Sequence, residues 1–350
     1  MINPDTGMGP HIDIVMSSRV RIARNLKQYF FPHRLNTDQA NELAEQVRSA
    51  VDHFPEERGN DFQWIKLKEL DPLDRLVHVE NHMISPALAD HPERGRFFVN
   101  SKSGCSIMVN EEDHIRIQCM MHGFRMQEAW TLADQLDDWL GRHLSYAFDD
   151  SLGYVTACPT NLGTGIRISL MLHLPALTML GYTNGLIRAA GQLGIAVRGA
   201  FGEGSEYLGN LYQVSNQITL GMQELEIIHN MEDIVQQVIH KEDLARQDLL
   251  ATQRIEVEDR IYRSLGILRH ARQMTRKEAM QHLSEIKLGI SLELINDCNL
   301  EGLHELMTLI QPANIQQHFG EKLMDQERDS RRAALIRKYF AEGGRCHVNE

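Results

Sequence analysis

The sequence predicts an α+β protein in two parts, a mixed strand-and-helix part followed by a mostly helical one. In the first part, short apolar runs alternate with glycine-containing turns, as in strands joined by tight connections. From Glu232 to Phe340 aromatic residues are few, charged patterns of helical spacing are long, and Pro312 is the only proline. We therefore expect one domain over residues 12–235 and a helical C-terminal domain over residues 236–345.

Composition narrows the functional class. A chain of 350 residues suits one large domain or two ordinary ones, and its formal charge of −12 argues against a protein that binds nucleic acid over its whole length, while leaving room for local positive pockets. No apolar stretch is long enough for a membrane span, and the N-terminus lacks the basic start and apolar run of a secretory signal. The five cysteines are scattered and include no C-x-x-C pair. This pattern favours a reducing cytoplasm and argues against a zinc or disulfide framework.

Three segments have patterns that predict single elements. Ile107–Val109 and Ile115–Ile117 flank a polar turn, which indicates two strands of a hairpin. Residues 126–147 and residues 325–340 have helical apolar spacing, and Asp325 is suited to cap the second of these helices. The apolar positions of the first helix are Trp130, Ala133, Leu136, Trp139, Leu140 and Leu144.

The first segment with chemical content is Ser17-Ser18-Arg19-Val20-Arg21. In a strand, residues two apart project to the same side, so Arg19 and Arg21 would present two guanidinium groups to one patch. A guanidinium fork suits phosphate oxygens and stays charged. The alternative for this segment alone is a strand with a solvated basic face.

The second segment is the polar turn itself, Asn110-Glu111-Glu112-Asp113-His114, with Arg116 just inside the next strand. Three consecutive acids repel one another unless a cation lies nearby. The segment could therefore offer both a carboxylate and a phosphate contact. The alternative is an exposed acidic hairpin tip.

Two glycine-containing segments follow. Cys158-Pro-Thr-Asn-Leu-Gly-Thr-Gly-Ile-Arg167 places a cysteine at a turn, where it could be a nucleophile or simply structural. Its G-x-G matches neither the P-loop nor the protein-kinase glycine loop. Arg198-Gly-Ala-Phe-Gly-Glu203-Gly-Ser-Glu206 has glycines that would let it close over a ligand, with Glu203 at its tip. The alternative for this second segment is a plain surface loop.

Together, in this order and at these spacings, the four segments resemble the ATP:guanido phosphotransferase family, which includes creatine and arginine kinases. The resemblance spans roughly residues 12–230 and rests on S-x-R-x-R, N-E-E-D-H-x-R, C-P-T-N-x-G-T-G and R-G-x-x-G-E. It implies an antiparallel sheet backed by helices, as in the glutamine-synthetase-like catalytic domain. It also implies ATP, with Mg²⁺ accompanying the nucleotide, and we see no separate metal motif.

The resemblance assigns roles to individual residues. Glu112 matches the carboxylate that binds the acceptor guanidinium and acts as general base, Glu203 matches the loop carboxylate on its other side, and Cys158 matches the cysteine beside it. The arginines match those around the ATP phosphates, and His82 matches a histidine near the adenosine. The expected nucleotide-binding residues are Ser17, Ser18, Arg19, Val20, Arg21, His82, Arg116, Arg167, Ile168, Ser169, Leu170, Met171, Arg198, Gly199, Ala200, Phe201, Gly202 and Glu203.

Two departures from kinases of free creatine or arginine are expected to matter. The S-x-R-x-R strand begins at Ser17, without the preceding helical domain of those enzymes, and a long helical segment follows the catalytic part. This layout resembles the bacterial protein-arginine kinases of protein quality control. The C-terminal segment also matches their R-D-x-x-R-A motif for binding phosphoarginine away from the active site, at Arg328, Asp329, Ser330, Arg331, Arg332 and Ala333. The alternative is a solvated helix face of mixed charge.

The expected activity is transfer of the γ-phosphate of ATP to arginine residues in proteins, in a heat-shock or quality-control role that marks proteins for degradation. The implied partners are proteins with exposed arginine, an activator protein, a heat-shock repressor and a Clp-type unfoldase or protease. No nucleic acid or membrane is expected, and a cytoplasmic homodimer is implied. The alternatives are a kinase of a free guanidino compound and a phosphoarginine-binding adaptor.

Overall fold

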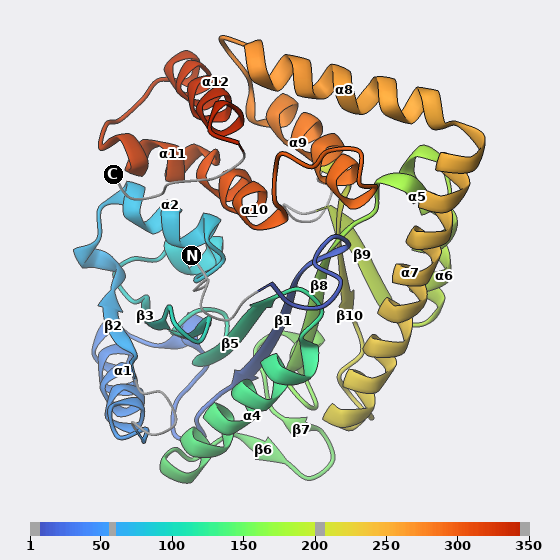
Figure 1. The fold of residues 1–350 in the computed structure, drawn as a ribbon. Helices are drawn as coiled ribbons and strands as arrows, with labels where there is room; N and C mark the ends of the chain where they lie inside the picture. Colours follow the sequence, from blue (N-terminus) through green and yellow to red (C-terminus); the bar gives the residue numbers. More distant parts are fainter. Residues whose placement is uncertain (1–7, 56–60, 200–206, 344–350) are drawn as a thin grey trace.

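An eight-stranded antiparallel sheet forms the centre of the protein (Figure 1). A computed structural model describes residues 8–55, 61–199 and 207–343. The strands lie in the order β2-β3-β4-β5-β1-β8-β10-β9, and every neighbouring pair is antiparallel. Their bounds are β1 Val15–Arg24, β2 Gln63–Lys66, β3 Arg96–Asn100, β4 Cys105–Val109, β5 Ile115–His122, β8 Ile166–His173, β9 Ile195–Gly199 and β10 Leu211–Asn216. A separate two-stranded hairpin consists of β6 Phe148–Asp149 and β7 Gly153–Tyr154.

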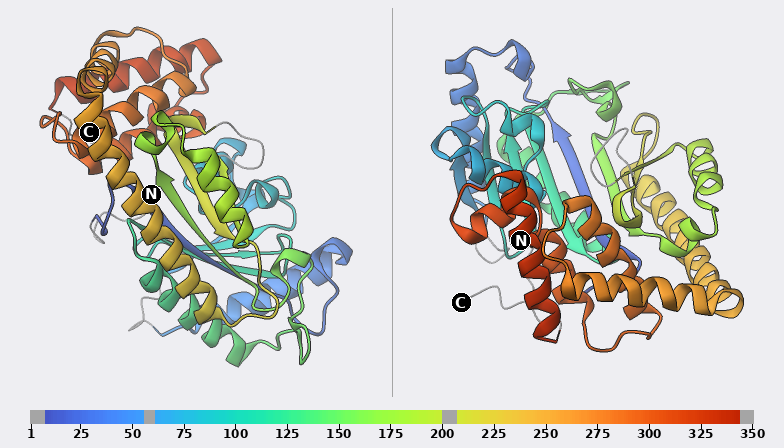
Figure 2. Two further views of the ribbon diagram at one scale, coloured as in Figure 1. Left: turned by 90° about the vertical axis from the view of Figure 1, so that its right-hand side faces the viewer. Right: turned by 90° about the horizontal axis from the view of Figure 1, so that it is seen from above.

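Helices back this sheet and continue beyond it at one end (Figures 1 and 2). The helices that accompany the sheet are α1 Thr37–Asp52, α2 Pro72–Glu80, α3 Pro86–Ala89, α4 Met126–His143, α5 Pro175–Met179 and α6 Thr183–Gln192. Those that follow are α7 Glu224–Thr252, α8 Arg254–His270, α9 Arg276–Ser291, α10 Leu300–Leu309, α11 Pro312–Phe319 and α12 Asp325–Ala341. The mixed fold with a helical C-terminal region confirms the predicted fold class. Among the described residues, no helix combines the length and apolarity needed to cross a membrane.

The two faces of the sheet differ because side chains alternate along each strand. In β1, Val20 and Ile22 are buried in the main core, together with Ile117 of β5 and Ile168 of β8. Helices α1, α4 and α7 contribute the other side of this core. Arg19 and its neighbours at alternate positions therefore project to the opposite face.

A smaller apolar cluster covers one end of that opposite face. It joins α3 and the turn after α2 to the outward side chains of β3, β4 and β5. The rest of the face, over β1, β8, β10 and β9, carries the polar residues described below. The members of the smaller cluster are Leu67, Met83, Ile84, Leu88, Phe97, Val99, Met108 and Met120.

The predicted single elements are present, with shifted ends. The hairpin is formed by β4 and β5, and its turn begins with Asn110 in a left-handed conformation (φ 61°). Helix α4 ends at His143 rather than at residue 147. The expected cap of α12 is wrong by one position, since Met324 is the N-cap and its backbone N–H donates to the Glu327 carboxylate (2.8 Å).

The predicted domain boundary, between residues 235 and 236, lies inside helix α7. This helix runs unbroken from Glu224 to Thr252, along the sheet and toward the C-terminal helices (Figure 1). The chain thus passes from the sheet to the helical part through a continuous helix rather than a linker. The boundary stays a prediction.

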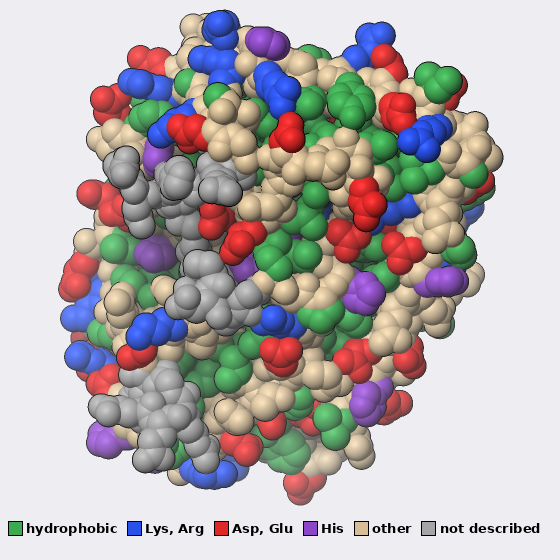
Figure 3. All heavy atoms as spheres, in the orientation of Figure 1, with side chains coloured by type: hydrophobic (Ala, Val, Ile, Leu, Met, Phe, Trp, Pro, Cys, Tyr) green, Lys and Arg blue, Asp and Glu red, His purple; other side chains and the backbone are tan. Residues whose placement is uncertain are grey.

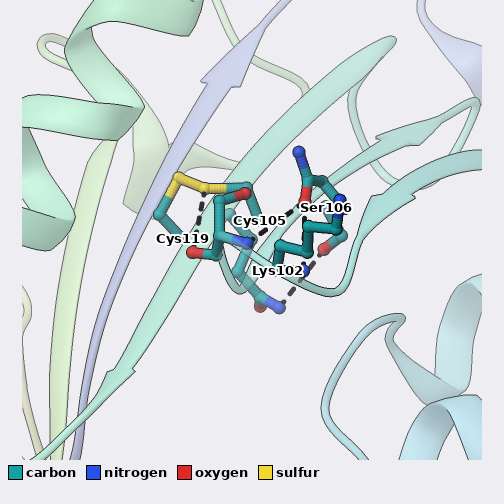
Figure 4. The surroundings of a disulfide bond; sticks show 7 residues. Lys102, Cys105, Ser106 and Cys119 are labelled. Carbon is teal, nitrogen blue, oxygen red and sulfur yellow. Dashed lines mark hydrogen bonds between the residues drawn. A yellow bond between two sulfur atoms is a disulfide. The ribbon is translucent and has the colours of Figure 1, made fainter. Parts of the chain in front are cut away.

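The cysteines differ from the expectation at one pair. Cys105 of β4 and Cys119 of β5 lie directly opposite each other, with Cα atoms 4.2 Å apart, and form a disulfide (Figure 4). Such a short Cα distance is typical of a non-hydrogen-bonded antiparallel pair, in which side chains are close. Spacing alone did not indicate the pair, because only the hairpin register makes the two residues neighbours. Cys158 and Cys298 are free thiols.

Candidate active site

Four arginines from three adjacent strands converge on the polar face of the sheet. Arg21 in β1 lies opposite Arg167 in β8, and Arg19 lies two residues away on the same strand. Arg116 extends from β5 on the other side of β1. The predicted common patch of Arg19 and Arg21 is therefore present, and the sheet register adds two more guanidinium groups to it.

Crowding of these cations shows in their acid–base behaviour. Burial, then the charges of Arg116 and Arg167, lower the pKa of Arg19 to about 10. Burial, then the charge of Arg19, also lowers the pKa of Arg21. Within the described structure, the buried Nε atoms of Arg21 and Arg116 have no hydrogen-bond partner. A bound polyanion would offset the repulsion between these guanidinium groups and accept hydrogen bonds from their unpaired N–H groups.

Neutral acceptors hold some of these side chains without cancelling their charge. Arg19 Nε donates to Ser169 Oγ (3.0 Å), and its Nη2 donates to Gln213 Oε1 (3.5 Å). Arg167 Nη2 donates to Ser215 Oγ (3.4 Å). Gln213 and Ser215 of β10 were not predicted as site residues, although the alternation of polar and apolar residues along that strand would have indicated them.

The other predicted nucleotide residues on these strands divide between the two faces. Ser169 and Met171 of β8 share the face of Arg167, and Ser17 pairs with Met171 across the strands. Ser18 is buried, where it donates to Gly123 O (2.8 Å) and accepts from Arg125 N (3.1 Å). Three other predicted nucleotide residues are buried in the apolar core on the opposite face, namely Val20, Ile168 and Leu170.

Arg198 and Gly199 end strand β9, the outermost strand of the polar face, and Arg198 lies opposite Gln213. The register thus places Arg198 on the same face as the other arginines. Ala200, Phe201, Gly202 and Glu203 lie outside the described residues. Their predicted contacts with nucleotide and acceptor stay predictions.

The acidic turn has an internal division of roles. Glu111 is nearly buried, and its Oε1 accepts from Arg116 Nη1 (2.6 Å) and from Ser85 Oγ (2.5 Å). Glu112 is exposed at the tip of the turn. Arg116 is therefore the nearby cation that offsets repulsion among the three acids. It pairs with Glu111, a residue that the sequence analysis did not single out. Glu112 stays accessible to a ligand.

Asp113, the third acid, ties this turn to the turn of Cys158. Its Oδ1 accepts from Ala157 N (2.6 Å) and Asn25 Nδ2 (2.7 Å), and its Oδ2 accepts from Asn161 Nδ2 (3.2 Å). Asp113 is buried, so these bonds are shielded from water. The hairpin that carries Glu112 and the turn that carries Cys158 are thereby held as one unit.

The Cys158 thiol is free and half-buried, with Sγ 3.0 Å from Thr160 Oγ1. The glycines that follow it have a packing role. Gly163 has φ 105°, and a Cβ there would lie 2.4 Å from the carbonyl oxygen of Thr219. The G-x-G of this turn thus allows a close backbone approach.

His82 lies in the turn after α2, with φ 59°. Its carbonyl oxygen accepts from Gln118 Nε2 (2.5 Å), and Gln118 lies opposite Arg21 in the sheet. The residue is exposed to solvent. Desolvation, then the charge of Arg19, lower the pKa of His82, which keeps the ring neutral near pH 7.

The C-terminal motif lies on α12 and is only partly accessible. Arg332 and Ala333 are buried. Arg332 Nε donates to Ile310 O (3.0 Å), and Nη1 donates to Met274 O (2.9 Å) and Asp329 Oδ1 (2.5 Å). Arg332 therefore links α12 to the segments that precede α11 and α9 in this structure.

The other motif residues lie nearer the surface. Arg328 forms an ion pair with Asp325, and Ser330 Oγ donates to Gln326 O (3.0 Å). The exposed Arg331 lies over the Phe319 ring, 4.8 Å from its centroid. Lys and Arg side chains are frequent over this end of the molecule, with Asp and Glu side chains among them (Figure 3).

Comparison with known proteins agrees with this geometry. The ATP:guanido phosphotransferase C-terminal catalytic domain matches residues 42–245, and the protein-arginine kinase McsB C-terminal domain matches residues 254–348. The first match covers more than half of the chain. The chain belongs to the ATP:guanido phosphotransferase family.

Relatives matched over nearly their full length are bacterial. A protein-arginine kinase of Geobacillus sp. (strain WCH70) is 47% identical over 330 residues, which cover 94% of this chain and 91% of that protein. The protein-arginine kinase of Brevibacillus brevis is 47% identical over 332 residues, covering 95% and 93%.

Solved structures support the fold. Lombricine kinase has a TM-score of 0.58 at 22% identity and covers 70% of each chain. The substrate-free duplicated taurocyamine kinase of Schistosoma mansoni has a TM-score of 0.60 at 22% identity, covering 92% of this chain and 50% of that one.

Proposed function

We propose that this enzyme transfers the γ-phosphoryl group of ATP to the guanidinium group of arginine side chains in proteins. The observation that carries the proposal is the convergence of four arginines on one sheet face, together with an accessible Glu112 in the turn that Asp113 ties to the turn of Cys158. The full-length similarity to protein-arginine kinases, including their C-terminal domain, supports protein arginine as the acceptor.

The arginines are proposed to bind the ATP phosphates. Phosphoryl transfer spreads negative charge over the oxygens of the transferred group. Arg19, Arg21, Arg116, Arg167 and Arg198 lie on neighbouring strands, and hydrogen bonds also hold Arg19, Arg116 and Arg167, so the cluster is proposed to stabilise that charge with little reorganisation. His82, neutral and accessible, is proposed to contact the adenosine.

The acceptor has the opposite requirement. A guanidinium group is a poor nucleophile while protonated, since its pKa is roughly 12.5–13.8. Glu112 is proposed to orient it for in-line attack and to accept its proton as the N–P bond forms. Glu203 is proposed to hold the guanidinium from the other side. The thiol of Cys158 is proposed to lie beside the guanidinium and to tune its charge without forming a covalent intermediate.

Magnesium is proposed to enter with ATP as part of the substrate. Among the described residues there is no group of three or more His, Cys, Asp or Glu placed to hold a metal ion. Arg328, Asp329, Ser330 and Arg331 are proposed to bind phosphoarginine, braced by Arg332. A cytoplasmic homodimer that works with an activator protein, a heat-shock repressor and a Clp-type protease completes the proposal.

The test is to incubate the enzyme with ATP and a protein, and separately with ATP and free arginine. Products are analysed by mass spectrometry without acid, because the N–P bond is acid-labile. We expect phosphoarginine in the protein and none as the free amino acid. Product only from free arginine would instead identify a small-molecule guanidino kinase, and no product in either arm would favour a phosphoarginine-binding adaptor.

A further inference from the structure

A contact between the catalytic part and the C-terminal helices converges on Glu80, the last residue of α2. Its carboxylate accepts four hydrogen bonds from the start of α11. Ala313 N donates to both oxygens (2.8 and 2.9 Å), and Asn314 donates to Oε2 from its backbone N and its side-chain Nδ2 (both 2.8 Å). These bonds join residues more than two hundred positions apart in the chain.

Glu80 replaces the local cap of α11. The N-cap of that helix is Gln311, whose side chain turns back to donate to Met307 O (2.8 Å), and Pro312 has no backbone N–H to offer. The first N–H groups needing an acceptor are those of Ala313 and Asn314, at the positions that an N-cap side chain normally serves. Glu80 provides that acceptor from another part of the fold.

The position of the Glu80 carboxylate does not stabilise its own helix, α2. A carboxylate at the C-terminal end of its own helix lies at the negative end of the helix dipole, where it is unfavourable. At the N-terminal end of α11 the same charge is favourable. The gain from Glu80 therefore comes from its attachment to α11.

Glu80 is also joined rigidly to His82. The turn after α2 is closed by backbone hydrogen bonds from Asn81 N to Val77 O, from His82 N to Val79 O and from Met83 N to His78 O, each 2.9 Å. Met83 is buried in the smaller apolar cluster. A displacement of the end of α2 must therefore carry His82 with it.

At its other side, α11 contacts the motif on α12. Arg332 Nε bonds the carbonyl oxygen of Ile310, just before α11, and Arg331 lies over the ring of Phe319, the last residue of α11. Contacts thus run from α12 through α11 and Glu80 to the turn of His82, and Figure 1 shows α12, α11 and α2 next to one another.

We propose that Glu80 is a positioning residue through which the C-terminal helices set the place of His82 for nucleotide binding. This inference rests on the proposed function in taking His82 as a nucleotide contact.

The experiment measures ATP affinity by calorimetry on the full chain, for the wild type, Glu80→Gln and Glu80→Ala. The matched control is Gln317→Ala, which removes an exposed contact between the same two helices, from Gln317 Nε2 to Asp74 Oδ1 (3.3 Å). We expect ATP affinity to fall roughly 2- to 30-fold in Glu80→Ala, the range typical of residues that couple distant sites. Glu80→Gln, which keeps one acceptor oxygen, should lose less, and Gln317→Ala should match the wild type.

A thermodynamic cycle tests whether Glu80 acts through His82. Once His82→Ala has removed the contact, Glu80→Gln should cause no further loss of ATP affinity. Melting temperatures are recorded for every variant. A lower melting temperature with unchanged ATP affinity would overturn the proposal, as would equal losses from Glu80→Gln with and without His82. Because binding is read without phosphoryl transfer, failure here is separable from failure of the proposed activity.

Discussion

Asp113 accepts a 2.6 Å hydrogen bond from the backbone N–H of Ala157, which fixes the acidic hairpin turn against the turn of Cys158. Both turns carry a residue proposed to contact the acceptor guanidinium. Their relative placement therefore depends on one buried carboxylate that itself need not touch the substrate.

Asp113→Asn should reduce both stability and turnover. The amide has similar volume, but it replaces one acceptor oxygen by a donor group that faces donors. Leaving buried groups unsatisfied costs about 1–3 kcal/mol. Thermal unfolding and steady-state kinetics check this, with the exposed Asp150→Asn as control. Wild-type kcat in Asp113→Asn would contradict the positioning role.

Glu112→Gln should remove most turnover while sparing ATP binding. The side chain is nearly isosteric, yet it cannot accept the guanidinium proton, and loss of a general base costs on the order of 10²–10⁴-fold in rate. Single-turnover rates and ATP calorimetry measure the two effects separately. Glu128→Gln, an exposed substitution on α4, should leave both unchanged. A near-normal rate in Glu112→Gln would mean that another group takes the proton.

Arg167→Ala should weaken ATP binding and slow transfer together. Arg167 lies opposite Arg21, so its guanidinium is expected to contact phosphate oxygens in both the ground state and the transition state. The KM for ATP and kcat are measured beside Arg188→Ala, an exposed arginine on α6. If Arg167→Ala left KM and kcat as unchanged as the control does, Arg167 would not be a phosphate contact.

Phosphoarginine binding away from the active site should depend on the accessible motif residues. Arg328→Ala with Arg331→Ala removes two cations, whereas Arg332→Ala would also break the bonds to Ile310 and Met274 and lower stability. Calorimetry with free phosphoarginine should show loss of the second binding site in the double variant, with kinase activity retained. Undiminished binding there would refute the assignment of the motif.

Stability should fall in mild acid through buried histidines. His304 is buried, and in the described structure its ring nitrogens have no hydrogen-bond partner. Burial, then the charge of Lys287, lower its pKa well below 6.5, so below about pH 6.5 the unfolded chain binds more protons. The contribution of His304 to the free energy of unfolding is thus fully present above that pH. It is lost as the pH falls, by up to about 1.4 kcal/mol per pH unit for one histidine.

Denaturant unfolding between pH 7.5 and 5.5 measures this dependence. His304→Leu should give a shallower slope than the wild type, and the exposed His91→Leu should leave the slope unchanged. The pKa of His173, which is also buried, is lowered in the same direction, so His304→Leu should flatten the profile only in part. An unaltered slope in His304→Leu would show that other groups carry the effect.

Local pattern was enough to predict the hairpin of β4 and β5, the two long helices and the shared face of Arg19 and Arg21. These features follow from the period of side chains along one strand or helix, which the sequence displays directly. The motifs that carry the family resemblance are also local, so the phosphotransferase class was accessible from the chain alone.

Contacts between distant segments were decided by the tertiary structure. Glu111 rather than Glu112 pairs with Arg116, Asp113 holds the Cys158 turn, and Cys105 bonds to Cys119 across a register that no spacing specifies. Glu80 caps a helix from a distant part of the chain. Sequence patterns report the periodicity within one element, whereas the partner of a buried polar group depends on how separate elements pack, and only the folded chain determines that.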